Sequence, residues 1–304
     1  GYLDAADFPY VDDVRVGVRP VGVRCGRIQD AQQRIGRLLS LYATTDTPTG
    51  YGGTLRPLSP PQVKLDLGMP VYVITINRNP YRRHRVLEQL RSVGIDAIVY
   101  TGTDGYGVSD EEVGLVYDKE EYQRNNPPTD NRDTLNPGNI GTCMSHFRLW
   151  QQLLDQGVEQ ALILEDDSMF GPDIHMLPKA MERLLPDDWD FVHLHHREFD
   201  NTPNYHPYEV VREEEGMQLV QYTGLIYYLL GYVIKTRAME TVLSRVYPFY
   251  EVVDVFVDPN FYHFPTRAGH SWLGLKRYGL LPKKQTTFVQ RDEATGTTVF
   301  GATA

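Results

Sequence analysis

Short apolar runs and amphipathic stretches alternate along the middle of the chain. The run "PVYVITIN" (Pro70–Asn77) is rich in β-branched residues, which is typical of a strand buried on both faces. The next stretch, "YRRHRVLEQLRSVG" (Tyr81–Gly94), repeats its apolar residues at helical spacing and ends at a glycine. We therefore predict a strand followed by a helix, with Val86, Leu87 and Leu90 on the inner face of that helix.

The same alternation continues beyond this first unit. "IDAIVYTGTDG" (Ile95–Gly105) predicts a second strand, and "NIGTCMSHFRLWQQLLDQG" (Asn139–Gly157) predicts a second helix. Two further strands are predicted at "QALILEDD" (Gln160–Asp167) and "WDFVHLHH" (Trp189–His196), with a helix between them over Met176–Leu185. Because strands separated by helices are typical of an α/β fold, we predict a mostly parallel sheet with helices on both faces.

The second half of the chain is less regular. "YEVVREEEGMQLVQYT" (Tyr208–Thr223) alternates around a charged turn that contains a glycine, which predicts a β-hairpin. "GYVIKTRAMETVLSRV" (Gly231–Val246) predicts a strand that leads into a helix. The polar, turn-rich stretch Asp118–Gly138 predicts a mobile loop, and we expect it to act as a lid over a bound ligand.

The first part of the chain differs in character from the rest. A helix is predicted over Ile28–Tyr42, and the connector "TDTPTGYGGTLRPLSPPQ" (Thr45–Gln62), rich in proline and glycine, follows it. We therefore predict two parts, namely an N-terminal extension over residues 1–66 and an α/β domain over residues 67–304.

Composition narrows the classes of protein that remain. The chain has 304 residues, of which 41% are apolar and 23% charged, as in ordinary soluble proteins. Its net charge of −10 argues against non-specific binding to DNA or to an anionic membrane. The two cysteines, Cys25 and Cys143, suggest neither a disulfide framework nor a zinc site. Because no signal-peptide pattern or membrane-spanning run is visible, we expect a cytoplasmic location and no integral membrane segment.

Three consecutive carboxylates, Glu165, Asp166 and Asp167, directly follow the apolar residues of one predicted strand. Like charges this close repel, so solvent, basic side chains or a divalent cation must compensate them. On an extended strand Glu165 and Asp167 point to one side and Asp166 to the other. Carboxylate oxygens suit Mg²⁺ or Mn²⁺, so we predict that Glu165 and Asp167 bind such an ion. The alternative is that these acids are solvated loop or cap charges.

Polar residues also follow the other predicted strands. Asn77 and Arg78 come after the first strand, and Asp104 comes after the second. In open α/β sheets, ligands bind beyond the carboxyl ends of the strands. We therefore expect these residues to meet the three carboxylates at one edge of the sheet, where a ligand would bind.

Several other polar or aromatic groups allow two interpretations. His193 and His195 are spaced for a shared metal, although buried structural histidines are commoner. The aromatic stretches "YPFY" and "FYHF" are compatible with stacking against a sugar or with core packing. One group of arginines either neutralises a diphosphate or forms the solvated face of a helix: Arg78, Arg82, Arg83 and Arg85.

Four segments occur in an order that resembles glycosyltransferase family 25: "VITINRNPYRR", "YTGTDG", "NIGTCMSHFRLWQQLL" and "ALILEDDSMF". "GYVIKTRAMETVL" and "VVDVFVD" resemble later landmarks of the same family. This family includes lipooligosaccharide β-galactosyltransferases and procollagen galactosyltransferases. The resemblance runs from Val71 to Val257 and does not extend to the first part of the chain or to its tail.

The resemblance implies a GT-A-like nucleotide-binding sheet and an inverting transfer of a hexose, galactose or glucose, from a UDP-sugar donor. It also implies Mn²⁺ or Mg²⁺ held by Glu165 and Asp167. On this basis the donor site contains Asn77, Arg82, Asp104, Ser145 and His146, and we assign Arg78 and Asp166 to it as well because of their places at the strand ends. The acceptor stays open and is a glycan, a protein hydroxyl or a modified nucleobase.

The resemblance also assigns the general base to Asp254. Apolar and aromatic residues surround it in "YPFYEVVDVFVDPNFYHF", and such surroundings favour proton uptake by a carboxylate. Asp258 and Glu251 are rivals for the role, and Asp254 as a helix cap is the structural alternative.

Two other classes of protein share these features. A metal-dependent nucleotidyltransferase or hydrolase uses a similar acidic strand end, and an inactive nucleotide-sugar-binding module keeps the same landmarks. The chain departs from the family pattern at Asn139, at Thr142 and in "YYLLGY" (227–232). These departures bear on the acceptor and the donor sugar rather than on the fold.

Overall fold

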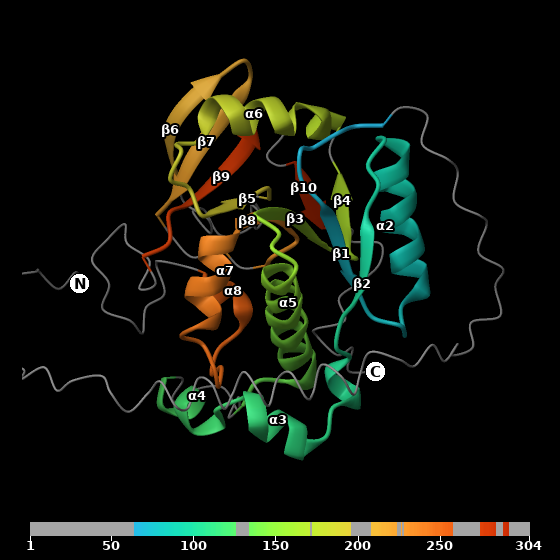
Figure 1. Ribbon diagram of the computed structural model, residues 1–304, viewed down its shortest axis with the longest axis vertical. Coiled ribbons are helices and arrows are strands. Elements are labelled where there is room, and N and C mark those ends of the chain that lie inside the picture. Colours follow the sequence, from blue (N-terminus) through green and yellow to red (C-terminus); the bar gives the residue numbers. More distant parts are fainter. Residues whose placement is uncertain are drawn as a thin grey trace, which may run out of the picture. The chain divides into compact units, whose positions relative to one another are not determined.

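The central sheet is built from the short apolar runs that alternate with helices in the sequence. The structure, a computed structural model, describes residues 64–125, 134–170, 172–195, 208–223, 226, 228–257, 274–283 and 288–291. Its strands are β1 (Val71–Thr75), β2 (Ile98–Thr101), β3 (Gln160–Glu165), β4 (Ser168–Phe170), β5 (Phe191–His193), β6 (Tyr208–Glu214), β7 (Met217–Tyr222), β8 (Gly231–Lys235), β9 (Arg277–Pro282) and β10 (Val289–Arg291). Eight of them form one sheet in the order β2-β1-β3-β8-β5-β9-β7-β6, and β4 pairs with β10 (Figure 1).

The α/β class is confirmed, but the prediction of a mostly parallel sheet is wrong for the described residues. β1 is parallel to β2 and β3, and β5 is parallel to β9. β8 runs antiparallel between β3 and β5, and β7 runs antiparallel between β9 and β6. Four of the seven pairings within the eight-stranded sheet are therefore antiparallel. The reason is that β7 is the second strand of the β6–β7 hairpin and β8 comes directly after it, so the alternation of strand and helix does not govern these two strands.

The helices of the described residues are α2 (Pro80–Ser92), α3 (Asp110–Val116), α4 (Lys119–Asn125), α5 (Pro137–Asp155), α6 (Leu177–Leu184), α7 (Thr236–Leu243) and α8 (Val253–Phe256), with short 3-10 turns η1 (Gly105–Gly107) and η2 (Pro172–Met176). α2, α5, α6 and α7 begin and end close to the predicted positions, whereas α3, α4 and α8 were not predicted. α5 begins at a proline, and the side chain of Asn136 caps it by accepting a hydrogen bond from the Asn139 N–H. α2 is followed by Gly94, whose φ of 80° lies in the left-handed region that ends many helices.

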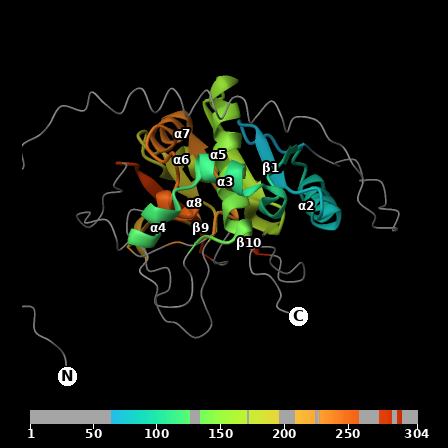
Figure 2. The same ribbon diagram turned by 90° about the horizontal axis from the view of Figure 1, so that it is seen from below.

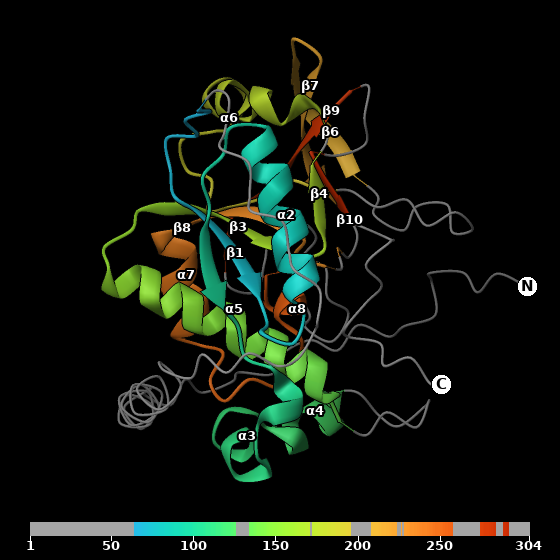
Figure 3. The same cartoon turned by 90° about the vertical axis from the view of Figure 1, so that its right-hand side faces the viewer.

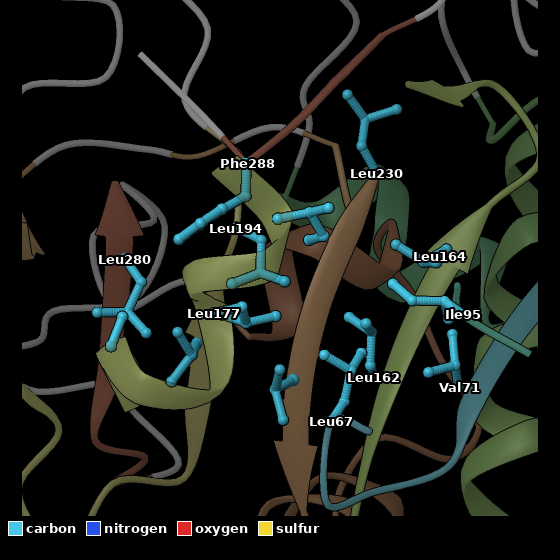
Figure 4. Packing of buried hydrophobic residues seen from close by; sticks show 14 of the residues in the cluster. Leu67, Val71, Ile95, Leu162, Leu164, Leu177, Leu194, Leu230, Leu280 and Phe288 are labelled. Carbon is cyan, nitrogen blue, oxygen red and sulfur yellow. The ribbon is translucent and has the colours of Figure 1, made fainter. Parts of the chain in front are cut away.

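One face of the sheet packs against α2 and α6. The buried cluster on this face takes alternate residues of each strand, such as Leu162 and Leu164 of β3. α2 contributes Val86 and Leu90, as predicted, and α6 contributes Leu177 among others. Figure 4 shows members of this cluster between the strands and α6, among them Leu162, Leu164, Leu177, Leu194, Leu230 and Phe288.

The opposite face packs against α5. Tyr232 of β8 stacks on Phe191 of β5 with their ring centroids 4.7 Å apart, and its hydroxyl contacts α5. Phe147 of α5 in turn packs against rings near α8, including Phe249 and Phe256. Figures 1 and 2 show α5 between α7 on one side and β1 on the other. α5 is thus buried over most of its circumference.

Two other predictions have clear outcomes. The hairpin is confirmed, because β6 and β7 meet at Glu215 and Gly216 with φ of 48° and 83°, which a two-residue turn requires. The stretch Asp118–Gly138 is not a loop throughout, since α4 occupies its first part and α5 begins at Pro137. Residues 126–133 lie outside the described residues, so the lid stays a prediction.

The chain divides by its contacts into two units, Gly1–Tyr42 and Ala43–Ala304. The predicted helix over Ile28–Tyr42 lies outside the described residues, and the predicted boundary between residues 66 and 67 stays a prediction. Figure 3 views the described elements of the second unit from the side of α2. None of the helices in the described residues is both long and apolar enough to cross a lipid bilayer.

A buried carboxylate ties the amino end of β5 to its neighbours. Asp190 is 1% exposed. It accepts hydrogen bonds from the Arg237 Nε–H at 2.6 Å and from the backbone N–H of Lys276 at 2.8 Å. Its own carbonyl accepts from the Lys235 N–H at 3.0 Å. Asp190 therefore links β5 to the end of β8, to α7 and to the segment that leads into β9.

We expect Asp190→Ala to lower the free energy of unfolding by about 1–3 kcal/mol, because it leaves the partly buried Lys276 N–H and the Arg237 side chain without their acceptor. Urea denaturation measures the loss. Asp188→Ala is the matched control, since Asp188 pairs with the side chain of the same lysine, Lys276, but is exposed. That control should lose at most about 1 kcal/mol. Equal losses in both variants would contradict the role assigned to Asp190.

Candidate functional site

Three parallel strands end side by side and carry polar residues just beyond their last apolar positions. In the register of the sheet, Ile74 of β1 lies opposite Glu165 of β3, and Thr75 lies opposite Thr101 of β2. β5 ends at the same side, because it lies one strand beyond β3 across β8. We call this side of the sheet the carboxyl edge. It is where ligands bind in open α/β sheets.

The three carboxylates form a turn at this edge. β3 stops at Glu165, and Asp166 and Asp167 turn the chain into β4. The Leu230 carbonyl accepts the Glu165 N–H at 3.0 Å and the Ser168 hydroxyl at 2.5 Å, which fixes both ends of the turn. We call Glu165–Asp167 the acidic turn.

Arg82 of α2 compensates part of the negative charge of the acidic turn. Its Nη1 lies 3.3 Å from Asp166 Oδ1 and 3.8 Å from Asp167 Oδ2. Glu165 instead faces His146. Strand alternation predicts that Glu165 and Asp167 point the same way, but the chain turns after Glu165. The structure therefore groups Asp166 with Asp167.

The position of the acidic turn changes the acidity of Asp166. Burial raises the pKa of its carboxyl above the ordinary value, and the negative charge of Glu165 acts in the same direction. Hydrogen bonds from Thr75 and Arg82, and the positive charge of Arg82, act against this and lower the pKa. Arg82 is itself only 5% exposed, so much of the compensation comes from within the protein rather than from solvent.

The loop after β2 packs directly on the first turns of α5. A Cβ added to Gly105 would lie 1.7 Å from the Pro137 carbonyl oxygen, and one added to Gly141 would lie 2.6 Å from the Gly105 nitrogen. Ser145 holds the same loop, because its hydroxyl donates to the Gly141 carbonyl at 2.6 Å and accepts the Thr103 N–H at 2.8 Å. Ser145 is buried and anchors the loop.

Asp104 is a partly exposed carboxylate of this loop. One of its oxygens accepts the Tyr106 N–H at 3.2 Å, and the other lies 3.3 Å from Arg78 Nε. The Arg78 guanidinium also lies over the Tyr106 ring, 4.7 Å from the ring centroid. Asn77 is exposed in the turn after β1. Asp104, Arg78 and Asn77 are therefore accessible to a ligand at the carboxyl edge.

His146 of α5 is buried against the face of the sheet, where its ring reaches residues of β3 and β8, rather than exposed at the edge. Its Nδ1 lies 2.7 Å from the Tyr232 hydroxyl, and its Nε2 lies 3.2 Å from Glu165 Oε1. The Trp150 Nε1–H donates to the same hydroxyl at 2.9 Å. Sequence reasoning did not identify Tyr232 or Trp150 as partners of His146, although a tyrosine on a buried strand needs a polar partner for its hydroxyl.

Asp254 lies in the first turn of α8, and its Oδ2 accepts the Tyr228 N–H at 3.0 Å. The segment from Tyr228 to Leu230 thus touches Asp254 at one end and the acidic turn at the other. Of the rivals, Glu251 is buried, and Asp258 lies outside the described residues.

The two histidines of β5 and the segment after it are packed among rings. His193 and His195 are both buried, with ring centroids 5.5 Å apart, and His193 packs against Tyr222. His196 lies outside the described residues. The placement of His193 and His195 favours the structural interpretation over a shared metal.

The described residues do not form a prepared cation site. They contain no group of three or more His, Cys, Asp and Glu side chains that could hold an ion. Glu165 is engaged with His146, and Asp167 lies near Arg82 with 6% exposure. One oxygen of Glu165 contacts His146 and one oxygen of Asp167 lies near Arg82, so the two carboxylates as placed do not converge on a set of ligands for Mn²⁺ or Mg²⁺ among the described residues.

Comparison with known proteins identifies the relatives of this chain. The family model described as "Glycosyltransferase family 25 (LPS biosynthesis protein)" matches residues 69–257. The acidic turn, Asp104, His146 and Asp254 all lie within these residues.

Some curated relatives are named as glycosyltransferases, and others are named as inactive members of the family. A rat protein named "Probable inactive glycosyltransferase 25 family member 3" is 26% identical over 81% of this chain and 43% of its own length. Zebrafish "Procollagen galactosyltransferase 1" is 24% identical over 65% of this chain and 33% of its own length. An Anopheles gambiae "Glycosyltransferase 25 family member" is 25% identical over 70% and 36%, respectively. The chain thus spans less than half the length of these relatives.

The raised pKa of Asp166 gives a test by pH. The folded chain holds the proton of Asp166 more tightly than the unfolded chain does. The protonated carboxyl therefore adds stability below the ordinary aspartate pKa of about 3.9, and this contribution is lost as pH rises through the raised pKa. Relative to the wild type, Asp166→Asn should therefore gain free energy of unfolding over that pH interval. Urea denaturation of both proteins at several pH values measures the difference. A difference that does not change with pH would contradict the prediction.

Proposed function

The chain belongs to glycosyltransferase family 25, and on this premise we propose that it transfers a hexose from a UDP-sugar to an acceptor hydroxyl. Family membership supports glycosyltransferase activity in general. The observation that carries the finer proposal is the carboxyl edge, where three parallel strands bring Arg78, Asp104 and the acidic turn together within the matched residues.

We place the nucleotide of the donor beside Asp104 and Arg78. Both side chains keep more than a third of their surface exposed, at 34% and 39%. A carboxylate accepts hydrogen bonds from ribose hydroxyls, and a guanidinium pairs with the anionic diphosphate. Their mutual contact of 3.3 Å orients both groups before a ligand arrives. Arg82 is less suited to the diphosphate, because it is buried against the acidic turn.

The proposed chemistry is a single displacement with inversion. The acceptor oxygen forms a bond to the anomeric carbon, the bond from that carbon to the diphosphate oxygen breaks, and UDP leaves with the electron pair. A carboxylate takes the proton of the acceptor hydroxyl. We assign this role to Asp254, because the Tyr228 N–H holds its carboxylate on a segment that also touches the acidic turn.

Cys143 is not suited to a covalent route. It belongs to α5 and is fully buried, with its Sγ 3.5 Å from the Glu251 carbonyl oxygen. Burial raises the pKa of its thiol well above the usual range. The negative charge of Asp254 raises that pKa further. A thiol that stays protonated is a poor nucleophile, so its surroundings favour direct displacement over a cysteine-bound intermediate.

No step of the proposed chemistry is assigned to a cation, because Glu165 and Asp167 are engaged with His146 and Arg82. The resemblance nevertheless implies Mn²⁺ or Mg²⁺, so the requirement is decided by assay. The alternative function is an inactive nucleotide-sugar-binding module, which the names of several relatives favour. Such a module would bind UDP-sugars without releasing UDP.

The full chain should release UDP from UDP-galactose or UDP-glucose when a suitable acceptor is present, and Asp104→Ala should raise KM for the donor about tenfold or more. Coupled detection of UDP measures both. Asp110→Ala is the matched control, because Asp110 is an exposed aspartate of α3 near the same loop. Equal effects of the two substitutions would contradict the proposed nucleotide position.

The same assay with excess chelator tests the cation. Unchanged activity would show that side chains alone bear the charge, and lost activity restored by Mn²⁺ would show that donor binding recruits an ion to the acidic turn. Binding of UDP-sugars without transfer to any class of acceptor would favour the inactive module. Release of phosphate or of a nucleoside monophosphate would point to a hydrolase or a nucleotidyltransferase.

Asp254→Asn should lower kcat by about 10² to 10⁴ while UDP binding persists, because the amide oxygen still accepts the Tyr228 N–H but cannot take up the proton. Steady-state kinetics measure kcat, and thermal stabilisation by UDP measures binding. Asp258→Asn is the comparison variant. If that variant loses turnover and Asp254→Asn does not, the base is Asp258.

A further inference from the structure

A buried chain of hydrogen bonds ends at the acidic turn. It begins at Trp150 of α5, passes through the Tyr232 hydroxyl and the His146 ring, and reaches Glu165 at the end of β3. The heavy-atom distances are 2.9, 2.7 and 3.2 Å in that order. Tyr232 is fully buried and His146 is 1% exposed, so neither side chain lines the edge itself.

The chemistry of the four groups fixes the direction of every bond. An indole nitrogen only donates, so the Tyr232 oxygen accepts from Trp150. The ionised carboxylate of Glu165 can only accept, so the His146 ring donates to it from Nε2. A neutral imidazole that carries its hydrogen on Nε2 accepts at Nδ1, so the Tyr232 hydroxyl donates its single hydrogen to Nδ1.

Tyr232 is well suited to remain the donor in this chain. Burial raises the pKa of its hydroxyl well above the usual range, and the negative charge of Glu165 adds to the effect. The hydroxyl therefore keeps its hydrogen at any working pH. His146 in turn has both ring nitrogens engaged, so it is not available as a general base.

We propose that Trp150, Tyr232 and His146 act as a positioning chain that fixes one oxygen of Glu165 and so sets the orientation of this carboxylate at the donor-binding edge. The proposal rests on the proposed function and deepens it. A glutamate loses considerable rotamer freedom when it is fixed, and a bond made before the donor arrives removes part of that entropic cost from binding and catalysis. Glu165 keeps 25% of its side chain exposed, so the oriented group still meets solvent or ligand.

Two substitutions of His146 separate its two contacts. His146→Asn places an amide oxygen near the position of Nδ1, so it keeps the Tyr232 bond and loses the bond to Glu165. His146→Gln places an amide N–H near the position of Nε2, so it keeps the bond to Glu165. We expect His146→Asn to lower kcat/KM about 10- to 100-fold, as loss of an orienting partner does elsewhere. His146→Gln should stay much closer to the wild type.

Thermal unfolding and UDP-sugar binding are measured on both variants. The proposal requires that transfer, and stabilisation by UDP-galactose or UDP-glucose, follow the bond to Glu165 and not the melting temperature. A purely structural role would make both variants lose activity in proportion to their loss of stability. Equal activity of the two variants at equal stability, or a better His146→Asn, would overturn the proposal.

The position of the hydrogen on the His146 ring can be tested without an activity assay. Nitrogen NMR of the full chain with labelled histidine at mildly alkaline pH distinguishes the two neutral tautomers, and His146→Gln identifies the resonance of His146. A hydrogen on Nε2 supports the chain, and a hydrogen on Nδ1 overturns it. If the wild type transfers no sugar from any donor, the proposed function fails, and this spectrum together with UDP-sugar binding decides the positioning chain separately.

Discussion

Three carboxylates at the end of a buried strand repel one another, and the fold around β3 is arranged to compensate them. Arg82 reaches Asp166 and Asp167 from α2, on one face of the sheet. His146 reaches Glu165 from α5, which packs on the opposite face. The acidic turn thus lies between two helices from different layers. The carbonyl of Leu230, the residue just before β8, fixes both ends of the turn by accepting two hydrogen bonds. The compensation requires both layers to be assembled, which couples the site to the packing of the sheet.

The elements themselves were predictable because they depend on local patterns. β1, α2, the β6–β7 hairpin and the passage from β8 into α7 all follow from apolar periodicity and turn residues. The order of the strands was not predictable, since β8 inserts between β3 and β5 far from its neighbours in sequence. The contact between Tyr232 and His146 depends on that insertion, because 86 positions separate the two residues.

The candidate site also has features that could be predicted from sequence and features that could not. The location of Glu165, Asp104 and Arg78 at one edge follows from strand ends, which sequence reveals. Their partners do not, because the turn at Asp166 breaks the alternation of an extended strand. The role of Ser145 was also not predictable, because its position in a helical pattern does not reveal that its hydroxyl binds the loop after β2. Family membership indicates the kind of activity, and the names of several relatives describe them as inactive.

The contact between the loop after β2 and α5 has a consequence for how this protein can diversify. Gly105 and Gly141 bring two backbones so close that neither position has room for a larger residue. An insertion or a new side chain at either position would displace the loop that carries Asp104. Changes in ligand preference at this end of the sheet are therefore confined to exchanging side chains such as Asp104 and Tyr106 on an unchanged main chain. For protein engineering, the main chain of this loop should be kept, and only its exposed side chains should be exchanged.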